Sequence, residues 1–531
     1  GVKLSSPLVK IDANAELQDL AHLVRLLPQK PDVSDELLRQ KLSIVGVFEL
    51  TPDRFEMKKV SSSLLNTSFN ISGAYKQAQE AGKRDLLNIA AAVRSADIDR
   101  WERLLNAGNQ AKAPTSEKKA IGQKWDKLVD PFLLPFDVQL EASVNDIVYN
   151  ERNYEKLFFK GQLANGALVI ETAGLEDKNT GPDIVVAGKV SDLQVPAGVD
   201  LSVSLQTSDW KKNLSNLDVK TETIPFDTGK ASIVMSLKGG REQLDVVTNV
   251  KALNGSLDLT GKVFKPLAEQ PDVQGLVLRL KHPDYAALVR SFQPSFQMAK
   301  GSKTGLDLYT KLESEGKSWS LYDIKLDLGP SHIEGSLDAD LSSKVPAVKT
   351  TLNFNNLPVD ELAGIPTKKA ATSPAKNKSK TNPEVRWSRS AINTDFLHRV
   401  NLDSTISGDT VSYGLWAVSQ PSIKLKIENG VLNVESLKGK IFNGDIDMTA
   451  KVKSFPEPRQ PVTLDTQIAL KNVLLEDFVS SFSGARIVTA KGTVSLDTTL
   501  NATGISPAAL IFDLNGKGST NGQSIVIHGF D

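Results

Sequence analysis

The sequence contains one short motif twice, and this repetition limits the possible folds more than any other feature of the sequence. The phrase N-G-x-L-x-apolar-E begins at Asn165 and again at Asn429. Tyr149 and Tyr413 precede the two copies at the same spacing. Self-similarity at a fixed separation is typical of chains that stack one structural unit. We therefore expect a repetitive architecture.

Long stretches of the chain alternate apolar and polar residues. Val138, Leu140 and Val144 follow this period in the first copy, and Leu402 and Ile406 follow it in the second. A period of two places successive side chains on opposite faces of a β-strand. If about half of the residues lie in strands of about ten, the chain holds about 25 strands. We predict a mainly β fold with an elongated, curved antiparallel sheet.

Short segments with helical spacing interrupt the strands. Asp97 and Pro283 stand at two of these junctions. Acidic residues cap the free N–H groups at a helix start, and proline is tolerated there. We expect short helices at one edge of the sheet.

Composition changes along the chain suggest a modular organisation. Two stretches rich in Lys, Ala, Ser, Thr and Pro lack periodicity, and we expect both to be linkers. The expected order is a sheet segment in residues 1–105, a flexible linker in 106–124, the first copy with further hairpins in 125–365, a disordered basic linker in 366–386, and the second copy in 387–531.

Composition also excludes several function classes. The 63 basic residues balance the 63 acidic ones, which argues against a nucleic-acid partner. The chain has no cysteine, its five histidines are scattered, and it contains no phosphate loop, nucleophile elbow or H-E-x-x-H motif. We therefore expect no enzyme activity, no catalytic residue, no cofactor and no metal.

The chain has no apolar run of about 20 residues, the length that spans a bilayer. It starts without methionine at Gly1 and stops at Asp531, directly after an alternating strand. We expect a fragment whose membrane anchor lies outside these residues.

A long sheet with one apolar face must cover that face with itself, with a second sheet or with a ligand. A sheet rolled into a trough leaves part of the face open, and an acyl chain fits such a trough. At about 0.8 kcal/mol per methylene, some 15 methylenes contribute roughly 12 kcal/mol. Acyl chains are therefore the expected ligand.

The C-terminal region contains a series of short motifs. Residues 492–510 contain A-x-G-x-S-x-x-x-L, residues 514–516 read L-N-G, and residues 529–531 read G-F-D. This series resembles the C-terminal signature of the AsmA family. The resemblance covers about residues 387–531 and is fainter before them. The chain lacks the family's N-terminal membrane helix and ends where the family usually continues.

The resemblance implies a repeating β-groove of the bridge-like lipid transfer type. Proteins of this type are anchored in the inner membrane of Gram-negative bacteria, work in the periplasm, and move phospholipid to the outer membrane. The resemblance implies the same for this protein. It also implies a role in outer-membrane biogenesis and integrity, with the two membranes as partners. Whether membrane proteins stand at the two ends is left open.

The candidate lining residues are the alternating apolar positions of the two copies. Each one is as well explained by plain core packing as by lipid contact. They are Val138, Leu140, Val144, Leu168, Ile170, Ile184 and Val186 in the first copy, and Val400, Leu402, Ile406, Leu432, Val434, Ile446 and Met448 in the second.

Two other architectures remain open on the sequence. One is a scaffold of closed β-sandwich units, such as an adhesin or an outer-membrane assembly factor, which would bind no lipid. The other is a polysaccharide-active β-helix enzyme, which needs clustered carboxylates and exposed aromatic residues. The chain has only six Trp and seven Tyr, which disfavours the enzyme.

Overall fold

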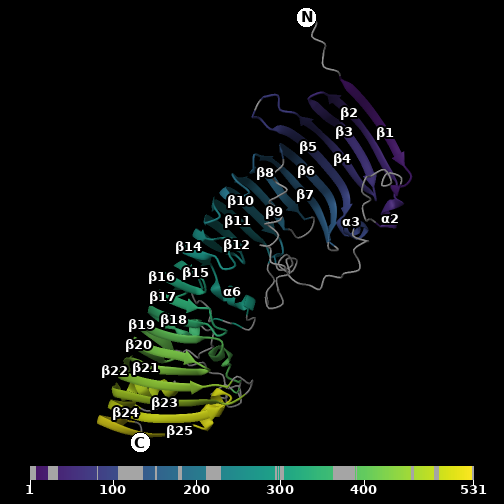
Figure 1. The fold of residues 1–531 in the computed structure, drawn as a ribbon. Helices are drawn as coiled ribbons and strands as arrows, with labels where there is room; N and C mark the ends of the chain where they lie inside the picture. Colours follow the sequence, from purple (N-terminus) through teal and green to yellow (C-terminus); the bar gives the residue numbers. More distant parts are fainter. Residues whose placement is uncertain are drawn as a thin grey trace. The chain divides into compact units, whose positions relative to one another are not determined.

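A computed structural model gives the fold of the chain (Figure 1). Both predicted linkers, 106–124 and 366–386, lie outside the described residues, as do residues 529–531 of the C-terminal signature. The structure describes residues 8–21, 34–80, 82–105, 135–149, 152–177, 182–210, 229–292, 296, 298, 304–362, 389, 391–455, 460–483 and 489–528.

The described residues contain 25 strands, and all of them belong to one sheet. The chain divides into two compact units. Unit 1 consists of residues 1–253 and 260–271, and unit 2 of residues 254–259 and 272–531, so each unit contains part of β13 (Gly255–Phe264). This division falls inside the segment 125–365, which holds the first copy and further hairpins. This architecture differs from a closed β-sandwich, because no second sheet faces the first within the described ranges.

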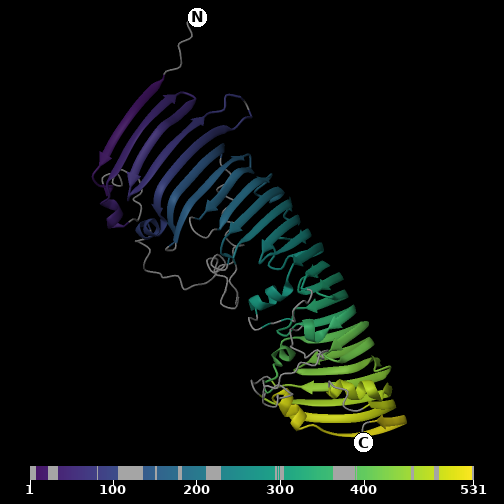
Figure 2. The ribbon, with the colours of Figure 1, turned by 180° about the vertical axis from the view of Figure 1, so that it is seen from behind.

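Unit 1 holds the first twelve strands. Within it the strands lie side by side in an open, curved sheet (Figures 1 and 2). They are β1 (Val9–Leu17), β2 (Leu42–Thr51), β3 (Arg54–Leu64), β4 (Thr67–Lys76), β5 (Asp85–Asp97), β6 (Phe136–Tyr149), β7 (Arg152–Ala164), β8 (Ala167–Glu176), β9 (Asp183–Val190), β10 (Ala197–Thr207), β11 (Ala231–Gly240) and β12 (Gln243–Ala252).

Unit 2 holds the last twelve strands, again in an open, curved sheet. They are β14 (Asp272–His282), β15 (Leu306–Glu315), β16 (Ser318–Leu328), β17 (Ser331–Asp340), β18 (Ala347–Pro358), β19 (Asn401–Tyr413), β20 (Trp416–Glu428), β21 (Val431–Ile441), β22 (Gly444–Lys453), β23 (Val462–Leu474), β24 (Thr489–Gly504) and β25 (Asn515–His528).

Within each unit every strand pairs with the next strand in sequence, and almost all of these pairs are antiparallel. Two pairs differ: β5 with β6, and β18 with β19, are parallel. A parallel pair needs a connection that returns to the starting edge, and both connections contain a helix and a long segment. The duplication therefore extends to a parallel pair in each copy.

The helices are short and lie at strand ends. In unit 1, α2 (Asp35–Leu38) and α3 (Ile98–Leu105) stand at the same edge. In unit 2, α6 (Tyr285–Phe292), α7 (Val359–Leu362) and α8 (Leu475–Ser483) share one edge. The 3₁₀ helix η3 (Asp395–His398) and α9 (Pro507–Phe512) lie at the opposite edge of unit 2.

The two repeated Asn-Gly pairs form matching tight turns. Asn165 and Gly166 have φ of 47° and 78°, and Asn429 and Gly430 have φ of 52° and 78°. Two successive positive φ angles are the requirement of a type I′ hairpin turn, which Asn and Gly accept most readily. The repeated phrase is thus the turn and the following strand of one hairpin, β7–β8 or β20–β21.

Candidate functional site

The register of unit 1 collects apolar side chains on one face of the sheet. Leu87 on β5 lies beside Val138 on β6, which faces Leu163 on β7. Leu163 faces Leu168 on β8, which in turn faces Val190 on β9. Directly paired residues point to the same side of a sheet, so these five strands share one row of aliphatic side chains. We call this side of the sheet the apolar face of unit 1.

All seven candidate residues of the first copy lie on this face. Their neighbours across the ladders are also apolar or glycine, as in the pairs Leu140–Gly161 and Val186–Ala173. All seven side chains are half-buried, and none is fully buried. They are Val138, Leu140, Val144, Leu168, Ile170, Ile184 and Val186.

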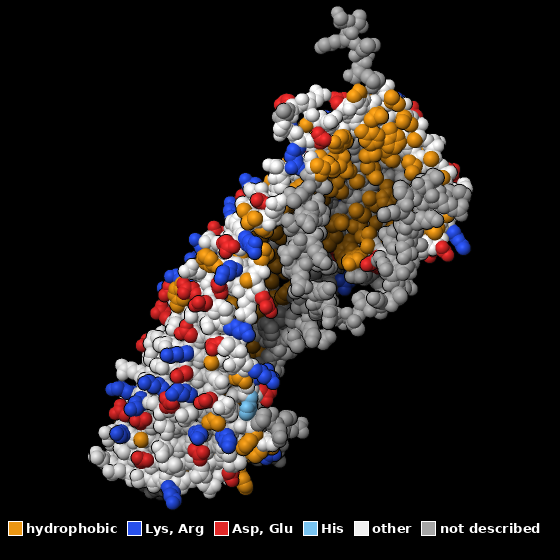
Figure 3. Space-filling model, in the orientation of Figure 1, with side chains coloured by type: hydrophobic (Ala, Val, Ile, Leu, Met, Phe, Trp, Pro, Cys, Tyr) orange, Lys and Arg blue, Asp and Glu red, His pale blue; other side chains and the backbone are white. Residues whose placement is uncertain are grey.

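Some large side chains on the same face are open to solvent. Leu157, which lies opposite Val144, is 49% exposed, and Phe55 on β3 is 38% exposed. Figure 3 shows apolar side chains gathered over the region of β1 to β7. A patch of this kind is rare on a soluble protein unless something binds there.

The opposite face of the same strands is polar. Glu141 on β6 faces Lys160 on β7. The Lys160 ammonium lies 3.3 Å from the Glu171 carboxylate and 4.0 Å from that of Glu141. A shallow hollow on this side is lined by amides and charged groups around Asn88. The two sides of unit 1 therefore differ sharply, as period-two alternation predicts.

One end of the apolar face of unit 1 is covered by α2 and α3. Leu37 from α2 and Leu104 from α3 are buried with Leu42 at the start of β2, and Trp101 packs against them. The Ser34 hydroxyl accepts a hydrogen bond from the Leu37 N–H at 3.2 Å and so caps α2. This cluster is the only place where the described part of unit 1 builds a buried apolar core.

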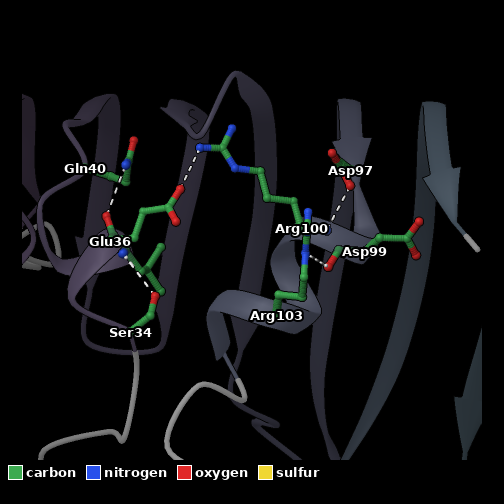
Figure 4. Close-up of polar contacts among 8 residues, drawn as sticks. Ser34, Glu36, Gln40, Asp97, Asp99, Arg100 and Arg103 are labelled. Carbon is green, nitrogen blue, oxygen red and sulfur yellow. Dashed lines mark hydrogen bonds and ion pairs between the residues drawn. The ribbon is translucent and has the colours of Figure 1, made fainter. Parts of the chain in front are cut away.

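An ion pair joins the two covering helices (Figure 4). The Arg100 guanidinium donates to the Glu36 carboxylate at 3.0 Å, and the two side chains are 35% and 57% exposed, respectively. Exposed pairs are worth about 0.2–1 kcal/mol because water and salt screen them. We expect Glu36→Gln to lower the free energy of unfolding by less than about 1 kcal/mol. Chemical denaturation checks this, and a larger loss would contradict an exposed pair.

The second copy forms an equivalent face in unit 2. Leu402 on β19 faces Ile427 on β20, which faces Leu432 on β21. Leu432 faces Val452 on β22, which faces Leu464 on β23. This row defines the apolar face of unit 2.

The candidate residues of the second copy are again half-buried. Val400 precedes β19 by one residue, and the register places the others on the apolar face of unit 2. They are Leu402, Ile406, Leu432, Val434, Ile446 and Met448. The register brings each copy's set together within its own unit.

The helix α8 packs onto the apolar face of unit 2, a contact that the sequence did not predict. Val473 is fully buried and Leu470 is 3% exposed beneath this helix. Phe478 of α8 meets Phe442 edge to face, with ring centroids 6.1 Å apart. The helical spacing of residues 475–479 signals the helix but not its target, because the target lies on other strands.

A hydroxyl pair interrupts the apolar face of unit 2 at its parallel strands. The Thr350 and Ser404 hydroxyls are hydrogen-bonded at 2.7 Å, and Ser404 is buried. The corresponding pair in unit 1 is Ala91 with Ala142. One hydroxyl donates to the other, so both are hydrogen-bonded and the pair is tolerated in an apolar setting. The alternating pattern of the sequence includes Ser404. Its hydrogen-bond partner could not be predicted, because that partner lies on a strand that only the fold brings beside it.

His332 lies on the polar side of unit 2 between two carboxylates. Its Nδ1 is 2.7 Å from Asp327, and its Nε2 is 3.2 Å from Glu334. Hydrogen bonds to Asp327, and then to Glu334, raise the pKa of His332 above its ordinary value. A raised pKa means that the protonated form is stabilised in the folded state.

We expect Asp327→Asn to return the pKa of His332 towards its ordinary value, as measured by NMR titration. The contribution of this pair to stability is fully present below the pKa of the unfolded chain, and it is lost as the pH rises through the higher folded pKa. The matched variant Glu334→Gln should lower the pKa less. An unchanged pKa in Asp327→Asn would contradict the hydrogen bond.

Across the ranges that the structure describes, no group of three or more His, Asp or Glu side chains is placed to hold a metal ion. Among the helices within those ranges, none has the length and apolar character needed to cross a bilayer.

The geometry defines a class: an open, mainly β protein with a polar side and a half-buried apolar side repeated in two units. Residues 299–531 match the model of the AsmA family, so this part of the chain is similar to that family. The match starts well before residue 387, so the resemblance reaches further upstream than its motifs suggested. Searches among curated proteins and among solved structures returned no match.

Proposed function

We propose that the apolar faces bind the acyl chains of phospholipids and carry them between the inner and outer membranes. The protein then acts in the periplasm and supports the biogenesis and integrity of the outer membrane. The match of residues 299–531 to the AsmA family model supports the proposal. One observation carries it: apolar side chains form rows across successive strands of an open sheet and are only half-buried.

Acyl chains suit this surface because they need apolar area without directional partners. Each methylene that leaves water contributes about 0.8 kcal/mol, so roughly 15 methylenes contribute about 12 kcal/mol. Similar rows on consecutive strands offer similar sites in series. Comparable sites avoid a deep trap, so that a bound molecule can also move on. In this proposal the protein binds and conducts without catalysing a reaction.

Native mass spectrometry of the chain, purified without detergent from bacterial cells, tests the proposal. We expect adducts whose masses correspond to phospholipids and which organic extraction removes. A chain of clean protein mass, which also takes up no lipid from added phospholipid vesicles, would contradict it. That second result is the one expected of a scaffold that presents its apolar face to another protein.

A further inference from the structure

One row at the end of the apolar face of unit 2 has polar residues at both ends. His282 on β14 faces Leu306 on β15, Leu306 faces Leu328 on β16, and Leu328 faces Ser331 on β17. Leu306 and Leu328 pack against a buried cluster that includes Tyr285, the first residue of α6. Figures 1 and 2 show α6 beside the ends of these strands.

Two hydroxyls in this place are buried without a hydrogen-bond partner. Tyr285 is 4% exposed and Ser331 is 2% exposed. Neither the Tyr285 hydroxyl nor the Ser331 Oγ makes a hydrogen bond. The imidazole of His282, by contrast, accepts the N–H of Asp284 at its Nδ1 at 3.0 Å.

A buried hydroxyl without a partner destabilises the folded state, so such groups are rare and call for an explanation. Two of them in one small region are less expected still. Both hydroxyls can donate. Leu328, which pairs with Ser331, is aliphatic, and so is Leu306, which packs with Leu328 against the cluster that includes Tyr285. The site therefore suits an acceptor atom that is carried on an apolar molecule.

We propose that the hydroxyls of Tyr285 and Ser331 bind the ester carbonyl of a diacyl lipid whose tail lies on the apolar face of unit 2 under α6. This inference rests on the proposed function and adds to it the part of the lipid that is recognised. The helix rests on the strands through side chains such as Val289, which packs against the cluster that includes Tyr285.

The surrounding charge favours a carbonyl over a phosphate. Burial, and then the negative charges of Glu361 and Asp284, raise the pKa of Tyr285 to about 12. The phenol is therefore a protonated donor at neutral pH, but the same two carboxylates repel an anion. A neutral ester oxygen accepts the hydrogen bonds without that repulsion.

Paired lipids test the inference. The affinity of the chain is measured for a diester phosphatidylcholine and for the diether analogue with the same chains, which lacks both carbonyls. We expect the diester to bind up to about tenfold more tightly, the worth of one net hydrogen bond or two weaker ones. Tyr285→Phe with Ser331→Ala should abolish this preference and leave binding of the diether unchanged.

Two measurements separate the alternatives. Tyr285→Phe should keep or raise the melting temperature, because it removes an unpartnered hydroxyl. As a control, Tyr309→Phe on the polar side should leave the preference for the diester lipid intact. Equal affinity of the native chain for both lipids overturns this inference alone. A lower melting temperature of Tyr285→Phe with an intact preference also overturns it, since it indicates a structural water. Binding of neither lipid overturns the proposed function as well.

Discussion

The double variant Leu168→Asp, Leu432→Asp will lose phospholipid crosslinking while its sheet stays folded. Both leucines are half-buried on the apolar faces, opposite Leu163 and Ile427 respectively. In the lipid-free protein each new carboxylate keeps water around it, so the fold tolerates it. An acyl chain laid over the carboxylate removes that water at a cost of several kcal/mol per charge.

The measurement uses a photoreactive residue at position 170 or 434, on the same faces as the substituted leucines. Irradiation of the chain with phospholipid vesicles should give a crosslinked lipid adduct in the parent protein. The aspartate pair should reduce the adduct on the order of 100-fold, the effect of about 3 kcal/mol. Circular dichroism should show an unchanged β spectrum.

A matched control uses the neighbouring positions on the polar side. Val169 is 43% exposed and points away from Leu168, and Asn433 lies between Lys426 and Lys451 on the polar side of unit 2. Val169→Asp with Asn433→Asp should crosslink lipid as well as the parent does. Equal loss in both variants, or equal retention in both, means that the apolar faces are not the path of the lipid.

Gly430→Ala will destabilise its hairpin far more than Gly166→Ala destabilises the equivalent one. Both glycines have φ of 78°, so alanine at either position incurs about 1–2 kcal/mol of backbone strain. A Cβ at position 166 meets nothing within 4 Å, whereas one at position 430 lies 2.1 Å from Cε1 of His398. That overlap adds about 1–3 kcal/mol.

Hydrogen exchange of the β20–β21 and β7–β8 amides measures the two losses separately. A double-mutant cycle isolates the clash. His398 is held over the turn by a 2.9 Å hydrogen bond from its ring to Ser454, and the Gly430 N–H donates to the Leu397 carbonyl at 3.2 Å. His398→Ala should recover much of the stability that Gly430→Ala loses. Equal losses at the two glycines, or no recovery, would contradict the packing of His398 on the turn.

The sequence predicted those features of the fold that depend on residues close together in the chain. Alternation at Val138, Leu140 and Val144 predicted which side chains share a face, and the register bears out that grouping. The Asn-Gly pairs predicted tight hairpins because few other residues accept two positive φ angles. The estimate of about 25 strands, from half of the residues in strands of about ten, matches the 25 strands of the described residues.

Long-range pairing was not accessible in the same way. Nothing in the run from Ile89 to Val93 indicates that its neighbour is β6 in parallel orientation, because that pairing depends on where a long connection returns. The burial of Val473 under α8 was equally hidden. Whether the fourteen candidate residues contact lipid stays a prediction, because each of them would look the same in a closed core.

The sequence by itself determined the strands, their turns and the two-faced character of the sheet, since these depend on residues close together in the chain. Only the tertiary structure decided which parts of the apolar side are covered. It placed α6 and α8 on the face of unit 2, and it set His398 on the second Asn-Gly turn while leaving the first turn open. Coverage is a contact between distant segments, so two copies of one phrase can have different surroundings.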